Sequence, residues 1–302
     1  MLRPRRNRRC VGGPACLWFE QIDGGSPLVH PRLEIRSGAE ELTTSSYGLW
    51  PWAALARCRQ LPLERPCEAV GIELSHLRDP GVRWSQSVCN RLAEFTFQQF
   101  GPSAAMAAAL TVQAGHFQLL ELLARTSPTV GDGLRVGCWF FPLLHSGGKL
   151  LHEQASDGSH AIAWRPPLGY EVHHGYVELT FAVTVLGIRR ETQRDDLVAR
   201  EVWFTHRKPS DSELHARVLG CEPDFDMPED RLVFDQSFAR LPLSRCNGAV
   251  HKKALRVATD LIGCDQQAYD RSISRPAHSR AERAQTQTSP RLPYVVPSVK
   301  RD

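Results

Sequence analysis

The sequence has no long hydrophobic run. A helix that spans a bilayer needs roughly 18 to 20 consecutive apolar residues, and the longest apolar stretch here, from Leu179 to Ile188, is about half that length. The N-terminus is rich in arginine, but no secretory signal follows it, because the apolar segment Cys16–Phe19 is too short. We therefore predict a cytoplasmic protein without a membrane partner.

Paired cysteine motifs and a strong excess of either charge are also missing. The nine cysteines include no C-x-x-C pair, so the sequence predicts neither a zinc ribbon nor a thioredoxin-type site. Without a secretory signal, reduced and buried thiols are expected. The net charge of +4 is only mildly basic and does not decide the class of partner. The contents of 42% hydrophobic and 23% charged residues are typical of a globular protein with a sizeable core.

No complete catalytic or cofactor-binding motif is present. The segment His145–Lys149 resembles a phosphate-binding loop, but Leu143 stands where the first glycine is needed, and Leu150 where Ser or Thr would hold magnesium. No Ser, Cys or Thr lies in a nucleophile elbow. The sequence therefore predicts no catalytic residue and no cofactor, and we expect that the chain is not an enzyme.

The histidines form no recognisable metal motif. His152 begins a pattern like that of zinc proteases, but Ser156 stands where the second histidine is needed. His173 and His174 are adjacent, so on a helix their side chains would diverge by about 100°. We therefore predict no metal site.

Apolar periodicity predicts an α+β fold, in which a helical N-terminal part packs on short strands and helices. The spacing favours helices over residues 51–59, 65–77, 85–100, 104–110, 115–125, 127–141 and 171–188. Lys149–Gln154 and His160–Trp164 form a predicted β-hairpin, because Asp157-Gly158 between them is a favoured tight-turn pair. Three glycines weaken the helix over 127–141 by up to about 1 kcal/mol each relative to alanine, so tertiary packing must hold it.

Local signals predict where some elements begin and end. Ser127-Pro128 is a predicted helix start, with serine as the cap and proline in the first turn. Ser210 and Glu213 have capping-box spacing, and Gly220 is a predicted helix terminator. Short β-strands are expected over residues 202–205 and 232–234.

Three blocks of sequence, in order, carry a family resemblance. The blocks are Val70–Ile72 with Leu77–Pro80, then Leu119–Leu134, and then Phe204–His206, Pro209, Leu219–Cys221, Leu232–Asp235 and Leu241–Leu243. Together they resemble the N-terminal ligand-sensing and dimerisation domain of AraC-type transcription regulators, over roughly residues 50 to 255. The resemblance implies a small-molecule effector, no catalysis, and a homodimer or a heterodimer with an intact regulator.

Candidate ligand contacts follow from pocket chemistry, which favours aromatic and apolar walls. On that ground we select Trp164, Tyr170, Tyr176 and Trp203 as ligand-binding residues. His206 is interpreted as a structural residue that orders the turn after its strand, with a ligand contact as the alternative.

The ends of the chain differ from its middle in composition. We assign residues 1–48 to a disordered basic leader, 49–255 to the sensing and dimerisation domain, and 256–302 to a mostly disordered tail. The tail holds no counterpart of the family's paired helix-turn-helix units, so we expect no direct sequence-specific DNA binding. Three explanations stay open: a frameshift or truncation, a genuine single-domain protein, and an unrecognised DNA-binding element. A product without independent function and an unrecognised small-molecule enzyme are the alternative functions.

Overall fold

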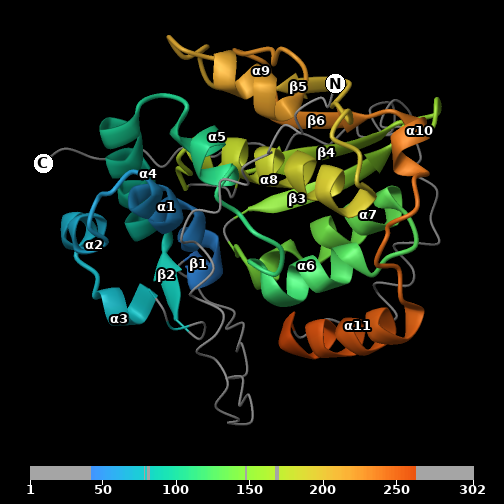
Figure 1. The fold of residues 1–302 in the computed structure, drawn as a ribbon, viewed down its shortest axis with the longest axis horizontal. Coiled ribbons are helices and arrows are strands. Elements are labelled where there is room, and N and C mark those ends of the chain that lie inside the picture. Colours follow the sequence, from blue (N-terminus) through green and yellow to red (C-terminus); the bar gives the residue numbers. More distant parts are fainter. Residues whose placement is uncertain (1–41, 78, 80–81, 147, 167–169, 263–302) are drawn as a thin grey trace, which may run out of the picture. The chain divides into compact units, whose positions relative to one another are not determined.

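The computed structural model describes residues 42–77, 79, 82–146, 148–166 and 170–262 (Figure 1). The predicted leader up to residue 41 and the predicted tail from residue 263 lie outside the described residues. Helices and two antiparallel sheets make up the described part, which confirms the predicted α+β class.

The elements follow one another as β1 (Thr43–Ser45), α1 (Ser46–Cys58), α2 (Glu64–Val70), α3 (Leu74–Leu77), β2 (Arg83–Ser85), α4 (Gln86–Phe100), α5 (Ala104–Ala109), α6 (Gln118–Arg125), α7 (Val130–Trp139), η2 (Phe141–Leu143), β3 (Lys149–Gln154), β4 (His160–Arg165), α8 (Gly175–Thr192), β5 (Glu201–Trp203), α9 (Glu213–Leu219), β6 (Arg231–Phe234), α10 (Gln236–Ala239) and α11 (Gly248–Ile262).

The helical N-terminal part contains the small sheet of β1 and β2. Arg83 of β2 donates a hydrogen bond to Oγ1 of Thr43 at 2.8 Å, across the antiparallel pair. Ser45 caps α1, because its hydroxyl accepts from the N–H of Tyr47 at 3.3 Å. Residues 43–48 therefore belong to the folded domain, and the leader boundary predicted at residue 48 lies too far along the chain.

The larger sheet has four antiparallel strands in the order β3-β4-β6-β5. β3 and β4 form the predicted hairpin, with Leu150 opposite Trp164 and with Gly158 at a φ of 80° in the turn. The first five residues of β4 are all buried, so this strand is covered on both faces. α7 packs against β3 and β4.

α8 is covered on more than one side, as its dense apolar sequence predicts. Phe181 and Ala182 are fully buried, and both α5 and α9 pack against the helix. α8 starts and ends four residues later than the predicted range of 171–188. Gln193 follows it in the left-handed conformation, at a φ of 56°, which ends the helix without a glycine.

The predicted start of α7 at Ser127 is wrong. The helix begins after Thr129, whose hydroxyl accepts from the N–H of Asp132 at 3.2 Å. The hydroxyl of Ser127 instead donates to the carbonyl oxygen of Leu123 at 3.0 Å, at the end of the preceding helix. Thr129 caps the helix in place of Ser127 because it has the extended backbone conformation that a capping residue requires.

The predicted capping box of α9 is also wrong, whereas its predicted end is confirmed. The helix begins at Glu213, whose N–H donates to the carboxylate of Asp211 at 3.2 Å, so Ser210 has no capping role. Gly220, at a φ of 85°, ends the helix in the left-handed conformation. Glycine is needed there because it alone adopts this conformation without a steric cost.

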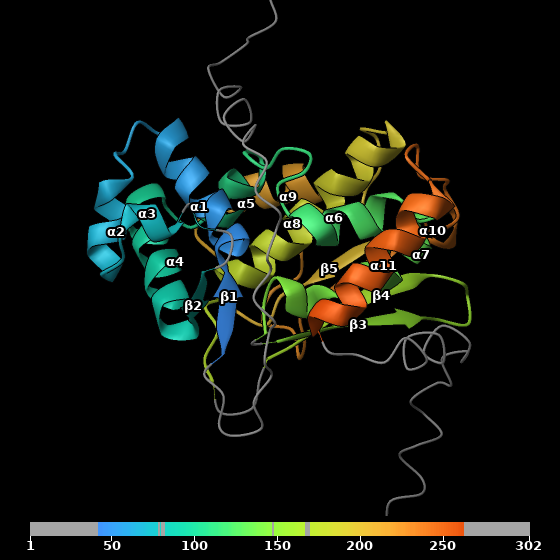
Figure 2. The same ribbon diagram turned by 90° about the horizontal axis from the view of Figure 1, so that it is seen from below.

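α11 extends the folded domain beyond the predicted boundary at residue 255. The helix lies alongside α6 (Figure 1, Figure 2). Ala254 and Ala258 are buried together with Leu123 of α6 in a second, smaller apolar cluster. Residues 256–262 therefore belong to a packed helix and not to the tail.

The glycines of α7 give a testable contrast. Gly137→Ala is expected to raise the free energy of unfolding by about 0.5 to 1 kcal/mol, because alanine favours a helix. Among the described residues, apart from the two chain neighbours and the nearby backbone of the helix itself, no atom lies within 4 Å of the position that the new Cβ would take. Gly133→Ala is the matched control, since its Cβ would lie 2.9 Å from the carbonyl oxygen of Ala124. Destabilisation by about 1 to 3 kcal/mol is expected there. Urea denaturation measures both changes, and a stabilised Gly133→Ala protein would contradict the account.

Candidate ligand-binding cavity

An apolar cavity of about 200 Å³ lies between α6, α7 and α8. Leu150 of β3 and Ile162 of β4 close one side of it, and Thr44 and Gly48 reach it from the N-terminal part. The cavity is therefore lined by segments that are far apart in the sequence. A predominantly apolar enclosure with a few polar groups is typical of small-molecule sites.

Over residues 176–188, the wall that α8 contributes is mainly apolar although it contains two threonines. The hydroxyl of Thr180 donates to the carbonyl oxygen of Tyr176 at 2.7 Å, and that of Thr184 donates to the carbonyl oxygen of Thr180 at 2.8 Å. Both hydroxyls are thus bonded to the helix one turn earlier. A ligand in the cavity meets a wall with little unsatisfied hydrogen-bonding capacity on this side.

Two glycines keep the cavity open. Gly137 of α7 and Gly187 of α8 both line it. In the described part of the chain, no atom beyond their own helix backbone and chain neighbours lies within 4 Å of the position of a Cβ at either residue. A larger side chain at either position would enter the empty space. The glycines therefore contribute to the volume that is available to a ligand.

An ionic network borders the cavity between α6 and α8. Arg125 lies 3.2 Å from the carboxylate of Glu191, and Arg190 lies 3.0 Å from that of Glu121. All four residues line the cavity. Nε of Arg125 is buried and has no hydrogen-bond partner among the described residues. A polar group on a ligand could accept from this N–H.

His145 and Tyr176 form the aromatic part of the wall. Their ring centroids lie 6.1 Å apart, nearly perpendicular to each other. The hydroxyl of Tyr176 donates to the carbonyl oxygen of Cys89 at 3.0 Å. Burial, together with the charge of Arg83, lowers the pKa of His145 to about 4, so the imidazole is neutral at pH 7.

The four aromatic residues selected from the sequence are only partly brought together. Tyr176 lines the cavity, and Trp164 lies behind its wall, with its ring 5.6 Å from that of His145. Trp203 is half-buried on β5, and Tyr170 is 43% exposed; neither lines the cavity.

Sequence reasoning missed most of the cavity wall. Gly137 was interpreted only as a residue that weakens a helix, and Gly187 was not singled out. A glycine in the apolar stripe of a long helix is a signal that could have indicated them, since it leaves a gap opposite a packed neighbour. No comparable signal in the sequence indicates the network of Arg125 and Glu191, because its members come from different helices.

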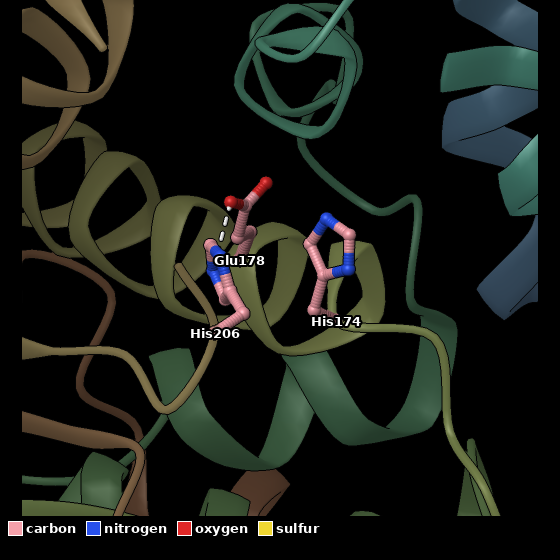
Figure 3. A group of neighbouring side chains, drawn as sticks. All are labelled: His174, Glu178 and His206. Atoms are coloured by element: carbon pink, nitrogen blue, oxygen red, sulfur yellow. Dashed lines mark ion pairs between the residues drawn. The ribbon is translucent and has the colours of Figure 1, made fainter. Parts of the chain in front are cut away.

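Figure 3 shows a cluster of His174, Glu178 and His206. None of the three lines the cavity. Burial would raise the pKa of the Glu178 carboxyl, but His206 and His215 outweigh it and hold the pKa below its ordinary value. Burial would lower the pKa of His206, but Glu178 outweighs it and raises that pKa. Nδ1 of His206 lies 3.0 Å from the carbonyl oxygen of Arg207, in the segment that its predicted structural role concerns.

Comparison with known proteins decides the family. A family model described as the arabinose-binding domain of AraC transcription regulators, N-terminal, matches residues 61–243, which is more than half of the chain. The chain belongs to this AraC regulator family. The match confirms the resemblance that the three sequence blocks indicate.

A solved structure resembles this AraC-type chain. The crystal structure of the transcriptional regulator CdpR from Pseudomonas aeruginosa shares 12% sequence identity with it, at a TM-score of 0.50. The similarity covers 79% of this chain and 74% of that one, and it shows a shared fold. No curated protein matches the chain. Among the described residues, no helix combines the length and the apolar character that crossing a membrane requires.

Proposed function

We propose that this domain senses a small effector, which binds in the cavity between α6, α7 and α8. The observation that carries the proposal is the cavity itself, which is apolar and almost wholly lined by residues within the matched range 61–243. Two lining residues, Thr44 and Gly48, precede that range. The family is one of transcription regulators, so the cavity serves binding and not a chemical reaction.

The chemistry of the wall defines the class of effector. A volume of about 200 Å³ suits a small molecule, and the apolar wall favours an aromatic or branched aliphatic body. The unpartnered Nε of Arg125 favours a single acceptor, such as a carboxylate, at the end near the ionic network.

α6 offers a route by which the effector acts on the rest of the domain. One face of α6 lines the cavity, and Leu123 on another face packs against α11. An effector that binds one arrangement of α6 more tightly than another shifts the population of the two arrangements. α11, which packs on α6, would then change position and alter its contacts with a partner.

α11 also supports the dimerisation part of the proposal. Val250 and Val257 are seven residues apart on this helix, and their side chains are 38% and 45% exposed. Residues at this spacing share one side of the helix, and Ala254, four residues after Val250, lies beside them at the edge of the side that packs on α6. A second copy of the chain is the partner that would cover this face.

The test is a thermal-shift screen of small metabolites, with indole and benzoate as defined probes. A ligand at about 100 times its Kd adds about 2.7 kcal/mol of stability and raises Tm by several degrees. Gly187→Leu is expected to abolish the shift, because the leucine occupies the cavity. Gly248→Leu, at an exposed position outside the cavity, is the matched control and should retain it. Equal shifts in the wild type and Gly187→Leu would place the ligand elsewhere.

A further inference from the structure

Three side chains that the effector site does not use converge near the start of α8. His174 immediately precedes the helix, Glu178 lies in its first turn, and His206 follows β5 (Figure 3). One ligand atom from each lies within 4.8 Å of the other two. His174 and Glu178 are four residues apart, so the helix places them on one face. His206 comes from the segment that follows β5.

The carboxylate of Glu178 is fully buried and only half satisfied. Its Oε1 accepts a hydrogen bond from Nε2 of His215 at 3.0 Å. Its Oε2 has no hydrogen-bond partner among the described residues. A buried charged oxygen without a donor is costly. A cation beside the carboxylate would offset part of that cost.

The tautomer of His206 also favours a cation at this cluster. The carbonyl oxygen of Arg207 can only accept, so Nδ1 of His206 carries the hydrogen of their 3.0 Å contact. In the neutral ring, Nε2 then presents its lone pair, 3.1 Å from Oε1 of Glu178. When the ring is protonated, the same contact is an ion pair in which Nε2 donates to Oε1. Two facing acceptors need a cation between or beside them, either a proton or a metal ion.

His174 supplies a third ligand atom for a metal ion. Its ring centroid lies 4.4 Å from that of His206. A tetrahedral ion with bonds of about 2.0 to 2.1 Å separates its donor atoms by roughly 3.3 to 3.4 Å. The 3.1 Å contact between His206 and Glu178 is close to that value. The ligand atom of His174 lies within 4.8 Å of the other two, so binding would require its partly exposed side chain to move closer to them.

We propose that His174, Glu178 and His206 bind one divalent transition-metal ion of the zinc type. Two imidazoles and one carboxylate are a ligand set that zinc accepts, with water at a fourth position. His215 would act as an outer-shell partner, because its hydrogen bond orients the carboxylate. The ion would fasten the segment after β5 to the first turn of α8. A buried proton shared between His206 and Glu178 is the competing occupant.

Calorimetric titration of the untagged full chain with ZnCl₂, after removal of metal by a chelator, tests the site. One equivalent is expected to bind at micromolar or lower Kd. Co²⁺ titration should give the visible absorption bands of a four-coordinate ion. His174→Gln, His206→Gln and Glu178→Gln should each weaken binding by about 100-fold or more, since even outer-shell changes cost 10- to 100-fold. His174→Gln is the key variant, because this residue is partly exposed and its replacement leaves the core intact.

His173→Gln is the matched control. Its Nδ1 accepts from the N–H of Gly175 at 3.0 Å, and its Nε2 lies 3.4 Å from Glu94, so neither nitrogen is free for the ion. It should bind zinc within about threefold of the wild type. Circular dichroism and thermal unfolding establish that each variant is folded. Absence of binding to the wild type at 1 mM ZnCl₂ (roughly the limit of weak sites) would overturn the proposal in favour of a shared proton. Binding that His174→Gln and His206→Gln leave unchanged would overturn it in favour of other ligands.

Discussion

Phe204→Ala is expected to lower the free energy of unfolding by about 3 to 5 kcal/mol, which is the usual cost of truncating a buried phenylalanine. The side chain is 0% exposed, and its ring lies 5.8 Å from that of Phe181 in α8 and 5.6 Å from that of Phe225. The ring thus joins the end of β5 to α8 and to the segment after α9. An alanine leaves a void between them.

The backbone at this residue limits any collapse of the void. The N–H of Phe204 donates to the carbonyl oxygen of Asp224 at 2.8 Å, and its carbonyl oxygen accepts from the N–H of Met227 at 2.9 Å. Because these two hydrogen bonds hold the backbone on both sides, the chain cannot move inward to fill the space. The expected loss of unfolding free energy therefore lies at the upper end of the range given above. Urea denaturation at pH 7.5 measures it. Leu151→Ala, at a side chain that is 39% exposed, is the surface control and should cost less than about 1 kcal/mol. A similar cost for both substitutions would show that Phe204 is not part of a cooperative core.

The second expected result is a loss of stability between about pH 6.5 and pH 4 that depends on His145. Burial, with Arg83 as a smaller cause, lowers the pKa of this histidine from 6.5 to about 4. The unfolded chain therefore binds a proton at a higher pH than the folded chain does. The stability that the neutral imidazole provides is complete above pH 6.5 and is lost as the pH falls toward 4. One such group lowers stability by about 1.4 kcal/mol per pH unit within this window.

His145→Gln isolates the contribution of this histidine. The glutamine does not titrate, so the slope of unfolding free energy against pH should decrease by about one proton, while other groups keep their contributions. His76→Gln is the control, at a side chain that is 57% exposed. The measurement is urea denaturation at half-unit intervals from pH 7.5 to pH 4. An unchanged slope in His145→Gln would contradict the buried neutral imidazole.

Local features of the sequence were sufficient for several elements. The β3–β4 hairpin follows from two apolar segments around Asp157-Gly158, and the end of α9 follows from Gly220. Each depends on residues within one turn or a few positions of one another. The start of α9 was missed for the same local reason: Ser210 and Asp211 are both acceptable partners for a free N–H, and the spacing alone does not choose between them.

The sequence alone determined the family and the α+β class, because strand and helix periodicity and the three ordered blocks are properties of neighbouring residues. Only the tertiary structure decided where a ligand fits. The cavity needs Gly137 on α7 and Gly187 on α8 to line the same space, and the histidine–glutamate cluster needs His206 to reach Glu178 across 28 residues. Contacts of this kind depend on how the helices pack against the sheet. The spacing of residues within one segment of the sequence does not indicate how far that segment lies from another.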